Sequence, residues 1–476
     1  MTELRLGLAN DDVLLVPRRS SVASRRTVST RSRFTRAIEL AIPIVSANMD
    51  TVTESATAIA LGRIGGIGVV HRFLPIEREA AEVARVKRAL NHVIEDPYRI
   101  RAGATVGEAR TETERQRVSG LLVTGDGGEL LGILTARDLR AEPDERRVHE
   151  AMTPADRLVT APPGVSLEDA RTVMNRHRVE KLPLVEEGAL RGLITLKDVE
   201  LRDLLPDATR DERGRLRVAA AVGVRGDYLA RAEALVAADA DALVLDIAHG
   251  HSDQAIEAIR ELKAAWPDVD VVAGNVATAA GVRDLAEAGA DAVKAGIGPG
   301  LVCTTRLVAG AGVPQLTCVL DCAPVAAGLG VPLIADGGIR RSADVAKAVA
   351  AGADTVMVGS LFAGTRESPG EVVVRGGRRY KVYRGMASRA AAASRTDLEH
   401  QADSLDQYVP EGVESVVPLK ESVVEIVNQL AGGLRSAVSY GGVQTLAEFR
   451  RDAELIRITE AAKQEPGAGS GLTGEG

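Results

Sequence analysis

Residues 332–360 read PLIADGGIRRSADVAKAVAAGADTVMVGS, and this stretch indicates the fold class. A short, mainly apolar run at 332–336 is followed by two glycines, and an amphipathic segment then leads to a second apolar run at 355–359. Short buried strands that alternate with longer amphipathic stretches are typical of parallel βα units. The stretch therefore predicts an α/β protein.

The same alternation recurs along the chain and gives eight candidate strands. They are Pro43–Ala47, Ile67–Val70, Val218–Val222, Ala242–Asp246, Val271–Ala273, Ala292–Ala295, Pro332–Asp336 and Thr355–Gly359. Eight βα units make a closed (β/α)8 TIM barrel, whose active site lies at the carboxyl ends of the strands. An open doubly wound sheet is the competing fold, but no Gly-x-Gly-x-x-Gly motif follows the first strand.

An internal repeat interrupts this alternation between about 97 and 203. Residues 132–138, GILTARD, match residues 192–198, GLITLKD. The two halves resemble a tandem pair of CBS (cystathionine β-synthase-type) modules, which sense nucleotides. The resemblance implies ATP or GTP binding with Thr135, Asp138, Thr195 and Asp198 at the ligand cleft. The alternative is that these residues cap the helices that follow them.

These patterns predict four segments. The barrel occupies 1–94 and 206–462, the tandem CBS module is inserted at 95–205, and the glycine-rich tail 463–476 is expected to be disordered.

Composition excludes several classes of protein. A net charge of -7 argues against a nucleic-acid surface, and 2% aromatic residues argue against stacking on single strands. No apolar run approaches the length of a membrane span, and the N-terminus lacks a signal-peptide core. Three cysteines suit a reducing compartment. We therefore expect a cytoplasmic protein that binds neither nucleic acid nor membrane.

A cysteine ends a glycine-rich turn directly after the sixth candidate strand. The turn, residues 296–306, reads GIGPGLVCTTR. Glycines let the backbone curl tightly around a ligand, and a thiol in such a turn is a better nucleophile candidate than one in an apolar stripe. Cys303 is therefore the candidate nucleophile. Cys318 and Cys322 lack the partners of a metal site and are expected in the core.

Two more glycine motifs follow the last two strands, where many barrels hold a phosphate through backbone amides. They are Asp336-Gly-Gly338 and Gly359-Ser360. The Asp336 carboxylate can accept hydrogen bonds from ribose hydroxyls. Together the motifs predict a nucleoside monophosphate, although ordinary strand-end turns are the alternative for each motif alone.

In this order the motifs resemble the IMP dehydrogenase/GMP reductase family along nearly the whole chain. They are Ser46–Thr53, Asp246–His251, Gly274-Asn275, Gly296–Arg306, Pro314-Gln315, Asp336–Gly338, Tyr383–Met386 and Gly432–Ser436. The resemblance implies GMP or IMP as substrate and product, a nicotinamide cofactor, and a homotetramer or octamer.

The resemblance also implies a role for each matching residue. Cys303 attacks C2 of the purine, Thr305 works beside it, and Glu411 meets the N1 edge. The nucleotide contacts Ser46, Asn275, Asp336, Gly338, Gly359, Ser360, Tyr383, Gly385 and Met386, and the cofactor contacts Asp246 and Gly296. Backbone carbonyls of Gly298, Gly300 and Cys303 bind a monovalent cation, usually K⁺. One departure is Leu301, which replaces the usual phosphate-binding serine, so that backbone amides and Tyr383 must carry more of the binding.

The two family reactions differ in the fate of the cysteine adduct. The dehydrogenase oxidises IMP with NAD and hydrolyses the adduct with a flap that carries an Arg-Tyr pair. The reductase converts GMP into IMP and ammonia with NADPH and needs no such base. Residues 387–401, ASRAAAASRTDLEHQ, contain no Arg-Tyr pair. Because a positioned base contributes about 10²–10⁴-fold, we expect GMP reductase, with IMP dehydrogenase as the alternative.

Some features oppose this choice. Arg389 stands where reductases place a catalytic glutamate, and it cannot act as an acid because it stays protonated. Glu411 or Glu399 would then relay the proton to ammonia. Residues 46–53 and 246–251 resemble the dehydrogenase branch, whereas Asp321-Cys-Ala323 resembles the reductase. A catalytically inactive nucleotide sensor and a flavin-dependent barrel oxidoreductase are the two hypotheses outside the family reactions.

Overall fold

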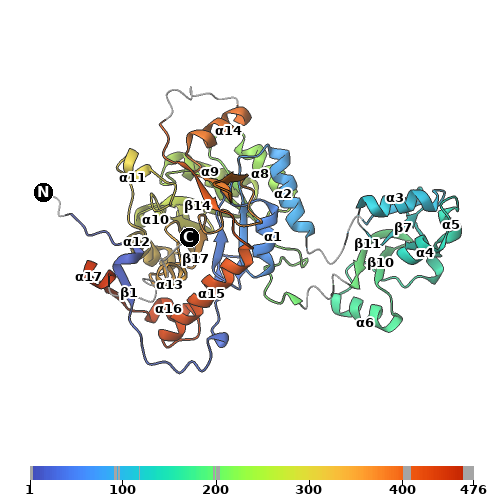
Figure 1. Cartoon of the computed structure of the whole chain (residues 1–476), viewed down its shortest axis with the longest axis horizontal. Coiled ribbons are helices and arrows are strands. Elements are labelled where there is room, and N and C mark those ends of the chain that lie inside the picture. The colour runs from blue at the N-terminus through green and yellow to red at the C-terminus, as the bar shows by residue number, and fades with distance from the viewer. Residues whose placement is uncertain are drawn as a thin grey trace. The chain divides into compact units, whose positions relative to one another are not determined.

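The computed structural model describes residues 4–89, 94, 97–116, 118–196, 199, 204–399 and 409–464 (Figure 1). They form two compact units. The barrel unit lies within Met1–Ala89, Asp207–Asp211 and Leu216–Gly476, and the repeat unit lies within Leu90–Pro206 and Glu212–Arg215.

Within the described residues, eight parallel strands close a barrel in the order β12-β13-β14-β15-β16-β17-β4-β5. Their bounds are β4 Ile44–Ser46, β5 Ile67–Val70, β12 Ala219–Val222, β13 Ala242–Leu245, β14 Asp270–Val276, β15 Ala292–Ala295, β16 Leu333–Asp336 and β17 Thr355–Val358. Each coincides with a strand expected from the sequence. Short, continuous apolar runs are typical of strands in a parallel sheet, because such strands are buried on both faces. The TIM barrel is confirmed.

Helices alternate with these strands and surround them in Figure 1. They are α1 Ser55–Arg63, α2 Ile76–Arg88, α8 Tyr228–Ala237, α9 Asp253–Ala265, α10 Ala279–Glu287, α11 Thr305–Val308, α12 Gln315–Gly328, α13 Ser342–Ala350 and α15 Val423–Tyr440. Between β17 and α15 the chain forms an antiparallel sheet of β18 Val372–Arg375, β19 Arg378–Arg384 and β20 Glu414–Pro418, with α14 Arg389–Glu399 between the last two strands.

The barrel core is closed at the amino-terminal end of the strands. Phe34, Ile38 and Leu40, from the hairpin of β2 Ser32–Arg33 and β3 Glu39–Leu40, pack into the interior cluster. Thr35 donates to the Asp270 carboxylate at the start of β14, which places this hairpin at that end. The apolar filling therefore leaves the carboxyl ends of the strands for polar groups.

The N- and C-terminal segments pair across the barrel unit. β1 Val13–Leu15, after the short helix Asn10–Asp12, is antiparallel to β21 Leu455–Arg457, which follows α16 Leu446–Asp452. Lys463, where the disordered tail was expected to begin, instead ends α17 Glu460–Lys463 and lies 2.6 Å from the carboxylate of Asp12. Residues 465–476 lie outside the described residues.

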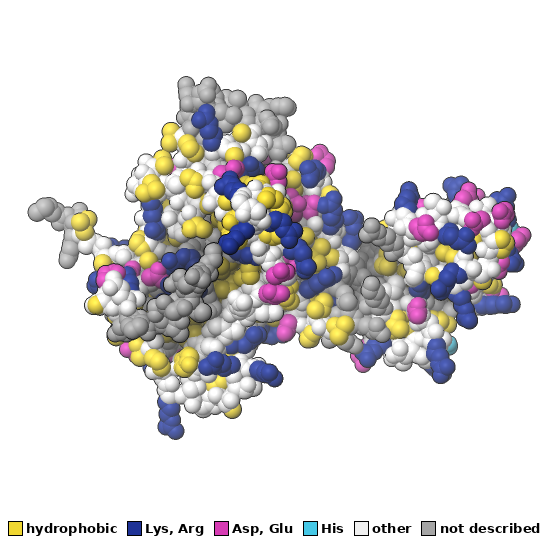
Figure 2. Space-filling model, in the orientation of Figure 1, with side chains coloured by type: hydrophobic (Ala, Val, Ile, Leu, Met, Phe, Trp, Pro, Cys, Tyr) yellow, Lys and Arg dark blue, Asp and Glu magenta, His cyan; other side chains and the backbone are white. Residues whose placement is uncertain are grey.

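The repeat unit contains two similar halves. The first has α3 Val106–Gln116, α4 Ala136–Ala141, α5 Val148–Ala151 and the sheet β6 Arg99–Arg101, β7 Gly120–Thr124, β8 Leu130–Thr135 and β9 Thr153–Pro154. The second has α6 Leu167–His177 and the hairpin β10 Lys181–Glu186 and β11 Ala189–Thr195. Leu122 and Ile133 of one half pack with Leu190 and Leu193 of the other. On the face drawn in Figure 2, acidic and basic side chains are interspersed over this unit.

Candidate active site

The loop after β15 carries the candidate nucleophile. Gly296 has φ +146° and Gly298 has φ +86°, and a Cβ at Gly296 would collide with the carbonyl oxygen of Asp336. Glycine fits this backbone because side chains are disfavoured at positive φ and the neighbouring strand end is so close. The turn leads to Cys303, whose Sγ lies 3.2 Å from the Oγ1 of Thr305 at the start of α11. The thiol thus has a hydroxyl partner for its proton.

A second segment, just before β20, contacts this loop. Cys303 and Gly412 form an isolated antiparallel bridge, and the N–H of Thr304 donates to the carbonyl oxygen of Glu411 at 2.8 Å. The backbone of Glu411 therefore lies beside the thiol loop, although Glu411 is 108 positions after Cys303 in the sequence. The structure brings together these two residues of the expected catalytic set.

A charged cluster lies at the ends of β14, β15 and β16. Lys294 Nζ lies 2.9 Å from Asp336 Oδ2 and also donates to the side-chain oxygen of Asn275. Asn275 Nδ2 donates to the same Asp336 oxygen at 2.9 Å and to the carbonyl of Gly296 at 2.7 Å. The sequence analysis missed Lys294, which is only 4% exposed. A lysine inside an apolar strand is itself a signal, because a buried charge requires a partner.

The turn after β17 is fixed by a lysine that the sequence analysis also missed. Lys420 Nζ donates to the carbonyl oxygens of Ser360 at 3.2 Å and of Leu361 at 2.8 Å. Lys420 follows β20, so this ammonium group joins the Gly359-Ser360 turn to the sheet of β18, β19 and β20. Its signal in the sequence is weak, because a lysine after a strand is usually a solvated side chain.

Tyr383 on β19 closes the same end of the site. It is buried, and a Cβ at Gly359 would lie 3.4 Å from its hydroxyl oxygen. Burial is the larger cause that raises the pKa of Tyr383 above its usual value, and the nearby carboxylate of Asp336 raises it further. The hydroxyl therefore remains a neutral hydrogen-bond donor beside the Gly359-Ser360 turn.

The residues that follow β19 also contact the thiol loop. The N–H of Gly385 donates to the carbonyl of Val413 at 3.0 Å, and a Cβ at Gly385 would lie 2.8 Å from the carbonyl oxygen of Val302. Met386 comes next and is half-buried. Gly385 therefore lies against the thiol loop, and Met386 is its neighbour in the sequence.

Ser46 is not brought into this group. It is fully buried at the end of β4, and its Oγ accepts a hydrogen bond from the Oγ1 of Thr53 at 2.9 Å. Its side chain faces α1 and β5, where a Cβ at Gly68 would lie 3.3 Å from the hydroxyl. Its position does not support the expected contact with a nucleotide.

The expected cofactor side lies at the ends of β13 and β5. Arg72 Nε lies 3.1 Å from Asp246 Oδ2, and the Arg72 guanidinium lies 5.1 Å from the ring centre of Phe73. Asp246 is therefore neutralised by an arginine from a distant part of the chain. The neighbouring His251 pairs with Asp284 at 2.7 Å and is a turn residue with a carboxylate partner. The sequence analysis missed Arg72.

The expected cation site would consist of backbone carbonyl groups and not of side chains. Gly298, Gly300 and Cys303 lie on one turn, and the Gly300 carbonyl accepts a hydrogen bond from the N–H of Cys303 at 3.2 Å. Backbone carbonyl oxygens of this kind can replace the hydration shell of K⁺. Among the described residues, no group of three or more His, Cys, Asp or Glu side chains is placed to hold a metal ion.

In the repeat unit, the expected nucleotide-binding pair forms a helix cap. Asp138 Oδ2 accepts hydrogen bonds from the backbone N–H of Thr135 at 2.8 Å and from its hydroxyl at 2.7 Å. This is the capping alternative for the first motif, and α4 begins there. Thr195 ends β11, and Asp198 lies outside the described residues.

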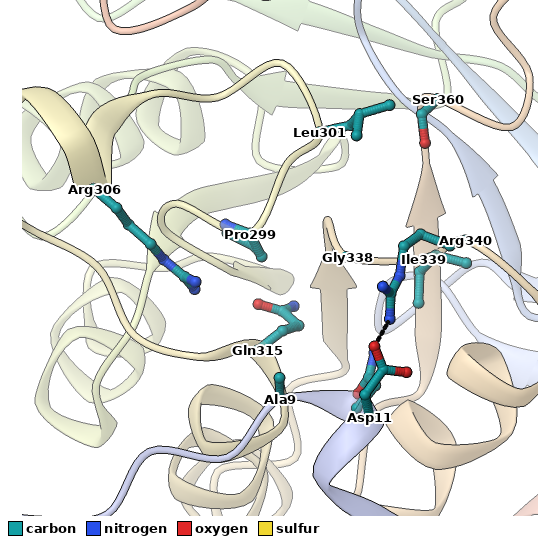
Figure 3. Close-up of a pocket in the computed structure, with 11 residues that line it drawn as sticks. Ala9, Asp11, Pro299, Leu301, Arg306, Gln315, Gly338, Ile339, Arg340 and Ser360 are labelled. Carbon is teal, nitrogen blue, oxygen red and sulfur yellow. Dashed lines mark hydrogen bonds and ion pairs between the residues drawn. The ribbon is translucent and has the colours of Figure 1, made fainter. Parts of the chain in front are cut away.

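A cavity of about 200 Å³ opens beside the Gly338 and Ser360 strand ends (Figure 3). Leu301, at the position of the usual serine, borders this cavity and is 67% exposed. Arg389 begins α14. The side chain of Glu399 and the segment 400–408, with Tyr408, lie outside what the structure describes.

A closed parallel barrel with a thiol loop and a charged cluster at the carboxyl ends of its strands defines a (β/α)8-barrel enzyme. The family model "IMP dehydrogenase / GMP reductase domain" matches residues 7–468. The chain belongs to this family of oxidoreductases, which use a nicotinamide nucleotide. In the part of the chain that the structure describes, no helix has the length and apolar character needed to cross a bilayer.

Relatives by sequence and by structure carry different names. Inosine-5′-monophosphate dehydrogenase of Nitrosopumilus maritimus is 49% identical over 97% of this chain and 98% of its own, and that of Aquifex aeolicus is 48% identical over 97% and 95%. A crystal structure of a cysteine-to-alanine variant of GMP reductase from Trypanosoma brucei, in complex with guanosine 5′-monophosphate, is 45% identical. It superposes with a TM-score of 0.92 and covers 98% of each chain.

Proposed function

We propose that this protein is a GMP reductase, which uses NADPH to convert GMP into IMP and ammonia through a bond between Cys303 and purine C2. One observation carries the choice between the two family reactions. Residues 387–401 contain no Arg-Tyr pair, so the flap lacks the base that hydrolysis of the adduct requires. The likeness to GMP reductase of Trypanosoma brucei over the full chain supports the proposal.

In the proposed reaction, the Cys303 sulfur bonds to C2 of GMP, and the bond from C2 to the amino nitrogen breaks. Ammonia leaves with a proton, and a hydride then replaces the sulfur at C2 to give IMP and the free thiolate. The balance is GMP + NADPH + 2 H⁺ → IMP + NH₄⁺ + NADP⁺. Thr305, 3.2 Å from the sulfur, exchanges the thiol proton. Glu411, beside the thiol loop, donates the proton to ammonia, because Arg389 cannot do so.

Other residues bind and orient the two nucleotides. Asp336, held by Lys294 and Asn275, accepts hydrogen bonds from the ribose, and the Gly338, Gly359-Ser360 and Tyr383 groups bind the phosphate end. Reduced nicotinamide supplies the hydride when bound against Asp246 and Gly296, and Arg72 holds Asp246 in place. The carbonyls of Gly298, Gly300 and Cys303 would hold K⁺ and fix the loop.

The proposal includes regulation and assembly. The repeat unit acts as a CBS pair that binds ATP or GTP near Thr135, Asp138, Thr195 and Asp198, and the chain assembles as a tetramer or octamer. Nucleotide titrations of activity test the first statement, and sedimentation with and without nucleotides tests the second. An activity that does not respond to ATP or GTP would contradict the regulatory role.

IMP dehydrogenase with NAD is the second candidate, because the curated relatives at 48–49% identity carry that name. Absorbance of reduced nicotinamide separates the two reactions. We expect absorbance to fall with GMP and NADPH and to remain unchanged with IMP and NAD. A rise with IMP and NAD, without a fall in the first mixture, would reverse the assignment. Cys303→Ala should abolish turnover in either case while IMP still binds.

A further inference from the structure

The cavity beside the Ser360 turn contains cationic side chains that the proposed mechanism does not use. Its lining residues are Ala9, Asn10, Asp11, Pro299, Leu301, Arg306, Gln315, Gly338, Ile339, Arg340 and Ser360. Gly338 and Ser360 are expected to contact the nucleotide phosphate. Figure 3 shows Arg340 between Ser360 and Asp11, with its guanidinium turned toward Asp11. The cavity therefore joins the phosphate end of the candidate site to an arginine.

Arg340 shares its carboxylate partner with a neighbouring arginine. Arg340 donates to Asp11 Oδ2 at 2.5 Å, and Arg341 donates to the other oxygen, Oδ1. Both arginine side chains are more than half exposed, but only Arg340 lines the cavity. If Arg340 turned away, Arg341 would still neutralise Asp11. Arg340 Nε also lies 3.7 Å from the buried carboxylate of Asp344, which keeps Arg341 Nε at 3.9 Å and the backbone N–H of Arg340 at 3.0 Å. Both carboxylates therefore retain a partner when the Arg340 guanidinium turns away.

The cavity also offers acceptors to a guanidinium that turns inward. Asn10 Oδ1 and Gln315 Oε1 are buried and lack a hydrogen-bond partner among the described residues. Both residues line the cavity. Buried polar atoms usually have partners, so these two oxygens favour a donor in this space. Leu301, in contrast, brings no hydrogen-bonding group to the same rim.

We propose that Arg340 binds the 5′-phosphate of the substrate nucleotide, exchanging Asp11 for the phosphate and so replacing the hydroxyl that Leu301 lacks. Guanidinium groups match phosphate oxygens in geometry and charge, and such charge-assisted hydrogen bonds are stronger than neutral ones. Arg306 stays where it is, because its guanidinium donates to the Val313 carbonyl at 2.8 Å. This inference rests on the proposed function, in that a purine monophosphate must occupy the candidate site.

The test compares IMP with inosine, which lacks the phosphate, by calorimetric titration of the full-length Cys303→Ala protein. IMP is the product of one family reaction and the substrate of the other, so the test does not depend on the direction. We expect Arg340→Gln to weaken IMP binding about 10- to 100-fold and to leave inosine binding unchanged. Arg340→Lys should restore part of the loss. Arg341→Gln makes Asp11 depend on Arg340 alone, so it should weaken IMP binding less than Arg340→Gln does and leave inosine binding unchanged.

Asp11→Asn tests the exchange with the opposite sign. It frees Arg340, so IMP should bind roughly 3- to 10-fold more tightly, with inosine unchanged. The proposal would be overturned if the Cys303→Ala protein bound IMP equally well with and without Arg340→Gln while the two proteins had the same melting temperature. Inorganic phosphate that binds without displacing IMP would also overturn it, because the cavity would then hold a free anion. Failure of wild type to bind IMP would instead refute the proposed function.

Discussion

The ammonium group of Lys294 lies 2.9 Å from Asp336 Oδ2, with the lysine almost completely buried at the mouth of the barrel. In the proposed function Asp336 accepts hydrogen bonds from the ribose, and such a carboxylate would repel the nucleotide phosphate unless a cation neutralised it. Lys294 supplies this cation from the floor of the site, which leaves the nucleotide side of Asp336 open.

Lys294→Met should therefore impair the site more than the fold. We expect kcat/KM to fall about 10- to 100-fold, because Asp336 loses its charged partner, and the free energy of unfolding to fall by about 1–3 kcal/mol. Steady-state kinetics and urea denaturation measure the two effects. Lys263→Met removes the Lys263–Asp291 pair, 3.0 Å long, at the other end of β15. It should lower stability with little change in kcat/KM, and equal losses in both variants would contradict the role of Lys294.

Gly296→Ala should disable the thiol loop. The added Cβ would collide with the Asp336 carbonyl in a backbone that disfavours side chains, so we expect turnover to fall at least about 10²-fold. Gly310→Ala also places a side chain at positive φ, +66°, but meets nothing within 4 Å. Gly310→Ala should cost about 1 kcal/mol of stability and retain most of the activity. Comparable activity in both variants would show that the close approach is unimportant.

Lys420→Met should loosen the Ser360 turn. The variant removes the donors that hold the Ser360 and Leu361 carbonyls, so we expect KM for the nucleotide to rise about 10-fold with a smaller change in kcat. Lys381→Met is the control, because Lys381 donates to the Thr365 carbonyl at 2.9 Å and to that of Ser368, farther along the same loop. It should lower stability and leave KM nearly unchanged. A rise in KM that is the same in both variants would argue for a general loss of packing.

Tyr383 should resist ionisation. Burial, and then the Asp336 carboxylate, raise its pKa in the folded protein above the usual value of about 10, so the folded state retains a proton that the unfolded chain loses. Stability from this group is complete below pH ~10 and decreases as pH rises above it. An absorbance titration of phenolate should show one tyrosine that ionises only when the chain unfolds. The signal should disappear in Tyr383→Phe, and its persistence there would contradict the assignment.

Different parts of the protein were predictable to different degrees. The eight barrel strands could be predicted because each is a short apolar run, next to a glycine or a carboxylate in all but the first (Pro43–Ala47), and such runs have few alternatives in a folded chain. Thr135 and Asp138 show the limit of a motif, since their spacing forms a helix cap and does not by itself distinguish a cap from a ligand cleft. Ser46 shows a second limit of sequence motifs. A shift of one residue along β4 decides whether a side chain faces the mouth of the barrel or the helix α1.

The missed residues share a physical cause. Arg72 contacts Asp246 across 174 positions and Lys420 reaches back 60 positions to Ser360, and neither pair has a signature in local sequence. Such partners follow from the closure of the barrel, which brings distant strand ends together. Lys294 alone carried a local signal, a charge within an apolar strand.

The amino-terminal end of the barrel is filled by the hairpin side chains of Phe34, Ile38 and Leu40. This filling limits the routes by which a ligand can reach the interior. Because that end is filled, the purine nucleotide and the nicotinamide nucleotide of the proposed reaction would have to enter and leave through the same opening, at the carboxyl ends of the strands. A bond to Cys303 would keep the purine in place while the other ligand passes through. We expect the segments around Leu301 and Glu411, at the rim of this opening, to determine the order in which the two nucleotides bind and dissociate. They would then influence the turnover rate without contacting the reacting atoms.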